Sequence, residues 1–215
     1  MAERKGLLIT FEGIDGSGKS THLRRLALWL EKQGIVPKTY AEPGGTDLGH
    51  HIRDILLKGK EPIEIRTEAL LFLAARSELV STVLLPSLAA GAVILLDRFT
   101  DSTLAYQGYG RGIDLNELSN LAKFAAHGLE PDLTFFLDIS PEQASKRCHR
   151  PHQAQDRFES AGLEYFARVR EGYLALAKAQ QGRMRLLDSS LSIDEVSKKI
   201  VEITTSKLIN TSHML

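Results

Sequence analysis

Short apolar runs alternate along the chain with longer segments in which apolar residues recur every three or four positions. The short runs predict buried strands, and the longer segments predict amphipathic helices. The run from Val93 to Leu96 has no polar alternation, which is typical of a strand covered on both faces. The alternation predicts an α/β fold with a parallel sheet of about five strands and helices on both faces. We expect the strands over residues 6–11, 36–41, 93–97, 133–138 and 184–187.

The first helix is expected directly after the first strand, because Leu23, Leu26 and Leu30 recur at helical spacing. Gly34 follows them and is a typical terminating residue. Later helices have start signals in which a capping side chain precedes an acidic residue or a proline. These signals are Asp114 with Glu117, Ser140 with Pro141, and Ser192 with Glu195.

Composition limits the possible functions of the protein. A chain of 215 residues has the size of one domain, which we place over residues 1–215. Lys and Arg number 27, as do Asp and Glu, so no overall positive charge favours a nucleic-acid partner. The single cysteine, Cys148, cannot form an intramolecular disulfide, which fits a reducing cytoplasm. The apolar run 7–11 is too short for a signal-peptide core or a membrane span, so we expect no membrane association.

Residues 13–20 match the Walker A phosphate-binding pattern in full. The match lies between the expected first strand and first helix, as the pattern requires, whereas a plain glycine-rich turn needs no such context. Glycines let main-chain N–H groups surround phosphate oxygens, and the helix N-terminus adds partial positive charge. We expect Lys19 at the β- and γ-phosphates of ATP and Ser20 on Mg²⁺. The residues expected to bind ATP are Gly13, Ile14, Asp15, Gly16, Ser17, Gly18, Lys19, Ser20 and Thr21.

A second metal ligand is expected where an apolar strand ends in a carboxylate. Asp97 and Asp138 both meet this description. We favour Asp97 because Arg98 follows it and would place an anion-binding group beside the metal. The alternative for Asp138 is a strand-end residue that caps the next turn.

The sequence favours a phosphotransferase over other P-loop classes. It has no Asn-Lys-x-Asp guanine motif and no Leu-Ser-Gly-Gly-Gln transporter signature. An enzyme that brings two phosphates together must neutralise both, and arginine does so through paired hydrogen bonds. A phosphate monoester, with a second pKa of about 6, is largely dianionic at pH 7, so such an acceptor needs no general base. The candidate arginines are Arg53, Arg76, Arg98, Arg147, Arg150 and Arg157.

An ordered series of motifs resembles the thymidylate kinase family and covers nearly the whole chain. The series is Phe11-Glu12-Gly13 before the Walker A loop, Glu42-Pro43-Gly44-Gly45-Thr46, Leu71-Phe72-Leu73-Ala74-Ala75-Arg76, Asp97-Arg98-Phe99, Ser102 with Ala105-Tyr106-Gln107-Gly108, Pro131-Asp132-Leu133-Thr134, and Asp156-Arg157-Phe158-Glu159. The resemblance implies a P-loop NTPase fold. It also implies phosphorylation of dTMP to dTDP with ATP and Mg²⁺, in the synthesis of dTTP.

The resemblance also assigns acceptor-binding roles. It implies that Phe72 stacks on thymine and Arg76 hydrogen-bonds the base, although the residues alone favour a core position for Phe72. Asp15 is expected at the 3′-hydroxyl. Tyr106 is expected against the sugar, where a 2′-hydroxyl would clash. The phosphate is assigned to Arg53 and Arg98, and the same pocket is expected to include Ser102 and Gln107.

Residues 145–160 correspond to the family's lid over ATP, although on their own they resemble a solvated loop. One branch of the family carries arginine where this chain has Gly16, so the catalytic arginine is expected from the lid. Arg147, Arg150 and Arg157 remain alternatives for that role, beside Lys19 and Arg98. Two features depart from the family: Ala41 replaces an arginine common in relatives, and residues 148–155 are unlike the usual glycine-rich lid.

The resemblance further implies a homodimer. Two rival functions stay open on the sequence. One is a kinase for another nucleotide or a nucleoside, and the other is a nucleotide-driven switch that transfers no phosphoryl group.

Overall fold

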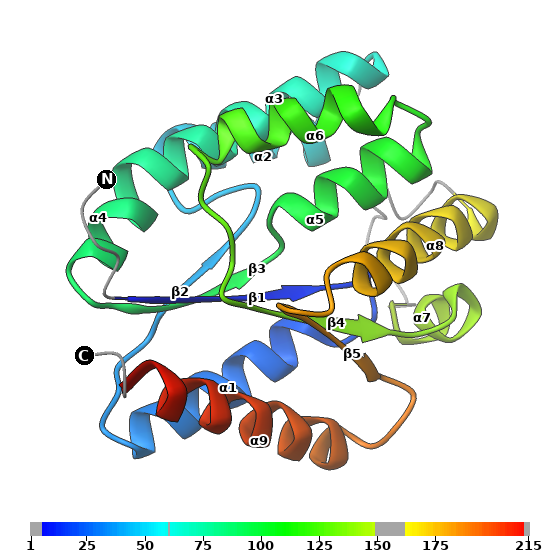
Figure 1. Cartoon of the computed structure of the whole chain (residues 1–215). Helices are drawn as coiled ribbons and strands as arrows, with labels where there is room; N and C mark the ends of the chain where they lie inside the picture. The colour runs from blue at the N-terminus through cyan, green and yellow to red at the C-terminus, as the bar shows by residue number, and fades with distance from the viewer. Residues whose placement is uncertain (1–5, 60, 149–161, 213–215) are drawn as a thin grey trace.

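The computed structural model describes residues 6–59, 61–148 and 162–212. At its centre is a five-stranded sheet in the order β2-β3-β1-β4-β5, with every neighbouring pair parallel (Figure 1). Two expected strands have the predicted bounds. The first strand is shifted by one residue at both ends, the second begins two residues later and the fifth ends one residue later. The strands are β1 (Leu7–Glu12), β2 (Lys38–Ala41), β3 (Val93–Asp97), β4 (Leu133–Asp138) and β5 (Met184–Asp188).

Helices cover both faces of the sheet, as the sequence predicted. Helices α1 and α9 lie together on one face, and α2 to α6 with α8 lie over the other (Figure 1). Two short π-helical segments, η1 and η2, interrupt the larger layer. The helical bounds are α1 Lys19–Lys32, α2 Asp47–Lys58, α3 Ile65–Leu79, η1 Val80–Leu84, α4 Leu85–Ala89, α5 Thr100–Thr103, η2 Leu104–Gly110, α6 Leu115–Ala125, α7 Pro141–Cys148, α8 Leu163–Ala179 and α9 Ile193–Ser212.

Strand β1 divides the core between the two faces. Leu7, Ile9 and Phe11 pack with α1 and α9, whereas Leu8 packs with the helical layer on the opposite face. Because side chains alternate along a strand, Glu12 lies on the same face as Leu8. A buried carboxylate therefore faces the larger helical layer at the carboxyl end of the central strand.

Helix boundaries follow the capping signals in the sequence. The side chain of Asp114 accepts hydrogen bonds from the first-turn N–H groups of α6. Before α9, the N–H of Ser192 donates to the Glu195 carboxylate while the N–H of Glu195 donates to Ser192 Oγ. This reciprocal pair is a capping box, and it fixes the start of α9.

Ile65–Ala89 forms one nearly continuous helix that is long and apolar enough to cross a membrane, with a mean hydropathy of 1.5. In this fold it acts as a core helix. Leu79 and Leu84 pack against the sheet, and the charged Glu68 and Arg76 are buried with partners of opposite charge. One side of the helix thus belongs to the core.

Candidate active site

The phosphate-binding loop follows β1 and enters α1 at Lys19. Gly13, Gly16 and Gly18 have φ values of 136°, 81° and 91°, which disfavour residues with a Cβ. A Cβ on Gly13 would also lie 2.7 Å from the carbonyl oxygen of Leu137. The glycine spacing of the motif is therefore a steric requirement of this loop.

Helix α7 packs directly on the tip of the loop. A Cβ on Gly16 would lie 2.5 Å from the Ala144 oxygen and 3.0 Å from Cys148 Sγ. The space above Gly16 is thus filled by α7. This packing is consistent with glycine, and not arginine, at this position.

Lys19 is almost fully buried at the base of the loop, with 6% of its surface exposed. Its Nζ donates to the Ile14 oxygen at 3.0 Å and lies 3.6 Å from Asp15 Oδ1. Burial lowers the pKa of Lys19, and the nearby positive charge of Arg98 lowers it further. The ammonium group is therefore held where its desolvated charge can meet phosphate oxygens.

Ser20 and Asp97 are brought together at the carboxyl edge of the sheet. Ser20 Oγ donates to Asp97 Oδ2 at 2.7 Å. The competing carboxylate, Asp138, instead accepts two hydrogen bonds from Arg170, at 2.7 and 2.9 Å. The geometry thus favours Asp97 over Asp138 as a metal ligand.

The oxygen donors at this position fit Mg²⁺. Within the described ranges, no three or more His, Cys, Asp or Glu residues gather into a metal site. Magnesium commonly takes one or two protein ligands and completes its shell with phosphate oxygens and water. A hydroxyl and a carboxylate beside a phosphate loop match that requirement.

A cleft of about 610 Å³, partly open to solvent, lies beside the phosphate loop on the side of the larger helical layer. It collects every residue that the sequence assigned to the acceptor: Asp15, Arg53, Phe72, Arg76, Arg98, Ser102, Tyr106 and Gln107. Glu42, Pro43, Leu57 and Thr103 complete its lining.

Arg98 joins the cleft to the phosphate loop. Its Nη2 donates to Asp15 Oδ1 at 2.6 Å and to the Tyr106 hydroxyl at 3.0 Å, and its Nη1 donates to the Gly13 oxygen at 3.0 Å. Burial raises the pKa of the Asp15 carboxyl, but the charges of Arg98 and Lys19 outweigh it and hold that pKa at about 2. Asp15 is therefore ionised and fixes the guanidinium between the cleft and the phosphate loop.

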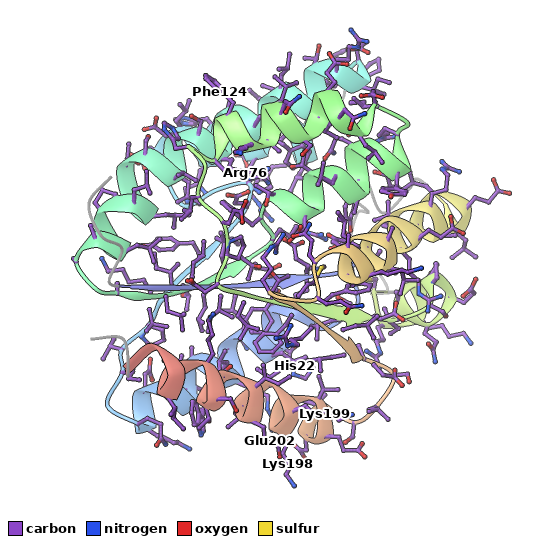
Figure 2. All side chains as sticks on the ribbon, viewed as in Figure 1. His22, Arg76, Phe124, Lys198, Lys199 and Glu202 are labelled. Carbon is purple, nitrogen blue, oxygen red and sulfur yellow. The ribbon has the colours of Figure 1, made fainter. Side chains whose placement is uncertain are left out.

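The far end of the cleft is closed by Arg76, which has 2% of its surface exposed and lies in the middle of the helical layer (Figure 2). It donates to Glu42 Oε2 at 2.7 Å, to Thr103 Oγ1 at 2.6 Å and to the Phe99 oxygen at 2.9 Å. Burial raises the pKa of Glu42, and Arg76 opposes this effect. These contacts hold the guanidinium plane rigid against the cleft and leave one Nη1 hydrogen outside them.

Tyr106 and Gln107 lie in the π-helix η2 and are almost fully buried. Gln107 Nε2 donates to Glu68 Oε1 on α3 at 3.2 Å. Short π-helical turns are frequent at functional sites because they redirect side chains. Both side chains are covered because η2 packs against α8 and α6.

Comparison with known proteins identifies the family. The thymidylate kinase family model matches residues 11–200. The chain belongs to the thymidylate kinase family. A thymidylate kinase of Prosthecochloris aestuarii is 46% identical over 209 residues, covering 94% of each chain. Those of Chlorobium luteolum and Nitrosospira multiformis are 46% and 44% identical over 204 and 196 residues, covering 91% of this chain and 95% of each relative.

Of the arginines expected in a lid of this thymidylate kinase family member, the structure describes Arg147. Arg147, on α7, donates to the Ser189 oxygen at 2.9 Å, and Ser189 Oγ donates to the Ser17 oxygen of the phosphate loop at 2.5 Å. Arg150, Arg157 and the rest of the segment 149–160 lie outside the described residues. Arg147 is thus linked to the phosphate loop indirectly, through Ser189.

Sequence reasoning assigned no site role to Glu12 or Tyr173, which together support Arg98. Glu12 has no exposed surface and accepts hydrogen bonds from the Phe99 N–H, the Ser102 hydroxyl and the Tyr173 hydroxyl. Burial raises its pKa to about 7, and the negative charge of Asp101 adds to this effect. Glu12 did carry a signal, since it is a charged residue at the end of an apolar strand. Tyr173 did not, because it reaches the site from α8.

Proposed function

We propose that this chain transfers the γ-phosphoryl group of ATP to dTMP, giving dTDP and ADP for the synthesis of dTTP. The observation that carries the proposal is the double attachment of Arg98, which lines the acceptor cleft and also bonds Gly13 and Asp15 of the phosphate loop. One guanidinium thus lies where a donor phosphate and an acceptor phosphate would meet. Membership of the thymidylate kinase family supports dTMP as the acceptor.

On the donor side, we assign the triphosphate to the loop 13–21 and to Lys19. Ser20 and Asp97 would hold Mg²⁺, which would neutralise charge on the β- and γ-phosphates when bound. Residues 145–160 act in this proposal as a lid within a single domain spanning 1–215. Arg147, Arg150 or Arg157 would then stabilise charge on the transferring group, and closure would exclude water.

On the acceptor side, Arg98 and Arg53 bind the dTMP phosphate, and Asp15 meets the 3′-hydroxyl. Phe72 is half-buried in the cleft wall, and in this proposal its ring stacks on thymine. The remaining Nη1 hydrogen of Arg76 is a donor for the base.

In this assignment, residues in and next to η2 contact the sugar. The ring of Tyr106 forms the cleft wall beside the sugar, and Ser102 and Gln107 complete that side of the cleft. The dianionic acceptor phosphate is itself the nucleophile, so positioning and charge stabilisation suffice for the reaction.

The test is ADP release from ATP·Mg²⁺ with dTMP, dUMP, UMP, dCMP, AMP and thymidine as separate acceptors. We expect strong turnover with dTMP and its loss in Arg98→Ala. Turnover with another monophosphate instead would keep the kinase chemistry and overturn the base assignments. Slow hydrolysis unaffected by any acceptor would support the nucleotide-switch alternative.

We also propose that two copies associate through the outer face of α3 and α6. These helices pack on each other through Leu73, Ala122 and Ala125, and neighbouring apolar side chains remain exposed. Phe124 is 83% exposed and points away from the rest of the molecule (Figure 2). With Leu70 and Leu121 it forms an apolar surface suited to a symmetric contact.

Light scattering on the eluting protein tests the dimer. We expect a mass near twice 23.8 kDa, reduced to the monomer mass in Phe124→Glu. Ile193→Glu is the matched control, because Ile193 is an exposed apolar residue on α9, away from this face. A monomeric wild type, or equal effects of both changes, would contradict the proposed surface.

The proposed location of the enzyme is the cytoplasm, where its single cysteine stays reduced.

A further inference from the structure

Glu12 is surrounded by the groups that hold Arg98. Its Oε1 accepts the Phe99 N–H at 2.7 Å, and its Oε2 accepts from Ser102 Oγ at 2.6 Å and from the Tyr173 hydroxyl at 3.0 Å. Arg98 Nη1 in turn lies 3.3 Å from Ser102 Oγ and 3.5 Å from the Tyr173 hydroxyl. Both hydroxyls therefore lie between the carboxylate and the guanidinium.

We propose that Glu12 is the positioning residue of the acceptor-phosphate clamp: it fixes the main chain at Arg98 and sets the direction of the hydrogen bonds made by Ser102 and Tyr173. The inference rests on the proposed binding of the dTMP phosphate at Arg98. It assigns Glu12 an action through Arg98, without contact to either substrate.

The first part of this role is a main-chain restraint. Arg98 has φ of 73°, a left-handed conformation that is strained for a non-glycine residue. The Arg98 N–H donates to the Phe11 oxygen at 3.0 Å, and the next N–H, of Phe99, donates to Glu12. Two consecutive residues of β1 thus hold two consecutive amides. Because β1 leads directly into the phosphate loop, the clamp and the loop are aligned on one strand.

The second part concerns hydrogen-bond direction. A hydroxyl group has one hydrogen and two lone pairs. Ser102 Oγ and the Tyr173 hydroxyl also lie 2.7 Å apart, so one of them can donate to the other while the other donates to Glu12. Whether they donate to an ionised Glu12 directly or through each other, both hydroxyls present lone pairs to the Arg98 N–H groups. The guanidinium is then drawn toward β1, in line with its bonds to Gly13 and Asp15.

Glutamine in place of Glu12 has nearly the same volume but the wrong polarity. Its amide carries one acceptor and one donor group, so in either orientation a donor faces a donor. If the amide nitrogen faces the hydroxyls, they accept from it, and at least one of their two hydrogens turns toward Arg98. If it faces β3, it opposes the Phe99 N–H. Glu12→Gln therefore changes the direction of the bonds while keeping the packing.

The experiment compares the affinities for dTMP and thymidine, measured by calorimetry without ATP at pH 8, where Glu12 is ionised because its pKa is about 7. We expect Glu12→Gln to weaken dTMP binding roughly tenfold to a hundredfold, the range for a disrupted hydrogen bond to a charged group. The affinity for thymidine, which has no phosphate, and the KM for ATP should change less than about twofold.

Asp101→Asn is the matched control. Asp101 is similarly buried, follows Arg98 closely in sequence and accepts hydrogen bonds from Arg183 at 2.7 and 2.8 Å, and neither residue of this pair lines the cleft. We expect this change to lower the free energy of unfolding and to leave dTMP affinity unchanged. Equal losses of dTMP affinity in both variants would reduce Glu12 to a general structural role and overturn the inference.

Other outcomes of these measurements are also decisive. Wild-type dTMP affinity in Glu12→Gln, or an equal loss for thymidine, overturns the positioning role, whereas a wild type that fails to bind dTMP contradicts the proposed function instead.

If Glu12→Gln does not fold, Tyr173→Phe provides the test, because phenylalanine keeps the ring contacts with Phe136 and Tyr106. We expect it to weaken dTMP binding roughly threefold to tenfold without affecting thymidine, and unchanged dTMP affinity overturns the inference.

Discussion

Ser20 Oγ donates to Asp97 Oδ2 at 2.7 Å, which ties the first turn of α1 to the carboxyl end of β3. Both side chains thereby present oxygen lone pairs at the entrance of the phosphate loop. The second strand-end carboxylate, Asp138, is neutralised by Arg170 and lies at the end of β4. The two aspartates therefore differ in what they can bind, although their sequence contexts are alike.

We predict that Asp97→Asn raises the Mg²⁺ concentration needed for half-maximal activity about tenfold or more, because a neutral amide is a weaker ligand for a hard cation. Magnesium titrations at fixed ATP measure this change. Asp138→Asn is the control, and it should lose stability without a changed Mg²⁺ requirement. The opposite pattern would move the metal site to β4.

Phe72→Ala should raise the KM for dTMP roughly tenfold to a hundredfold, as expected for the loss of one base–aromatic stack, with a smaller effect on kcat. Initial rates over a range of dTMP concentrations provide the measurement. Phe166 is a suitable control, because it is also half-buried in the same apolar cluster but does not line the cleft. If Phe166→Ala raises the KM equally, the effect comes from the cluster and not from stacking.

The parts of the fold that are encoded locally were predictable. Strand positions followed from apolar runs, and the starts of α6 and α9 followed from capping residues that lie within the first turn. The length of β2 was overestimated by two residues, because an edge strand with exposed side chains carries no burial signal at its beginning.

The candidate site likewise has one part that is encoded locally and another that depends on residues far apart in the sequence. The phosphate loop is a contiguous motif, and its conformation follows from its glycines. The contact between Tyr173 and Glu12 joins residues 161 positions apart, and no local pattern reports it. The burial of Gln107 likewise depends on α3, which supplies Glu68 from 39 positions away. Only the family resemblance, and then the structure, placed Gln107 in the pocket.

Gly16→Ala should raise the KM for ATP roughly tenfold, because its Cβ would press on the Ala144 oxygen and move α7 or the loop, at a cost of about 1–3 kcal/mol. Gly34→Ala offers a close control: Gly34 has the same φ of 81°, but a Cβ there would meet nothing within 4 Å. It should therefore incur only the strain of a left-handed alanine. Kinetics and urea unfolding of both variants separate these effects, and equal KM values for ATP would argue against α7 packing on the loop.

The stability of the protein should depend on pH through Glu12. Burial and the charge of Asp101 raise its pKa from 4.5 to about 7, so between these values the folded state binds a proton that the unfolded state has lost. The free energy of unfolding must then fall as pH rises from about 4.5 to 7 and level off above that range. The full shift corresponds to about 3 kcal/mol.

Glu12→Gln isolates this contribution, because the other titrating groups are common to both proteins and cancel in the difference. The stability of the wild type relative to the variant should fall by about 2–3 kcal/mol between pH 5 and pH 8. Urea unfolding without nucleotide, followed by circular dichroism at both pH values, measures it. A difference that stays constant with pH would show that Glu12 is ionised throughout, held so by Arg98, Ser102 and the Phe99 N–H, which all lower its pKa.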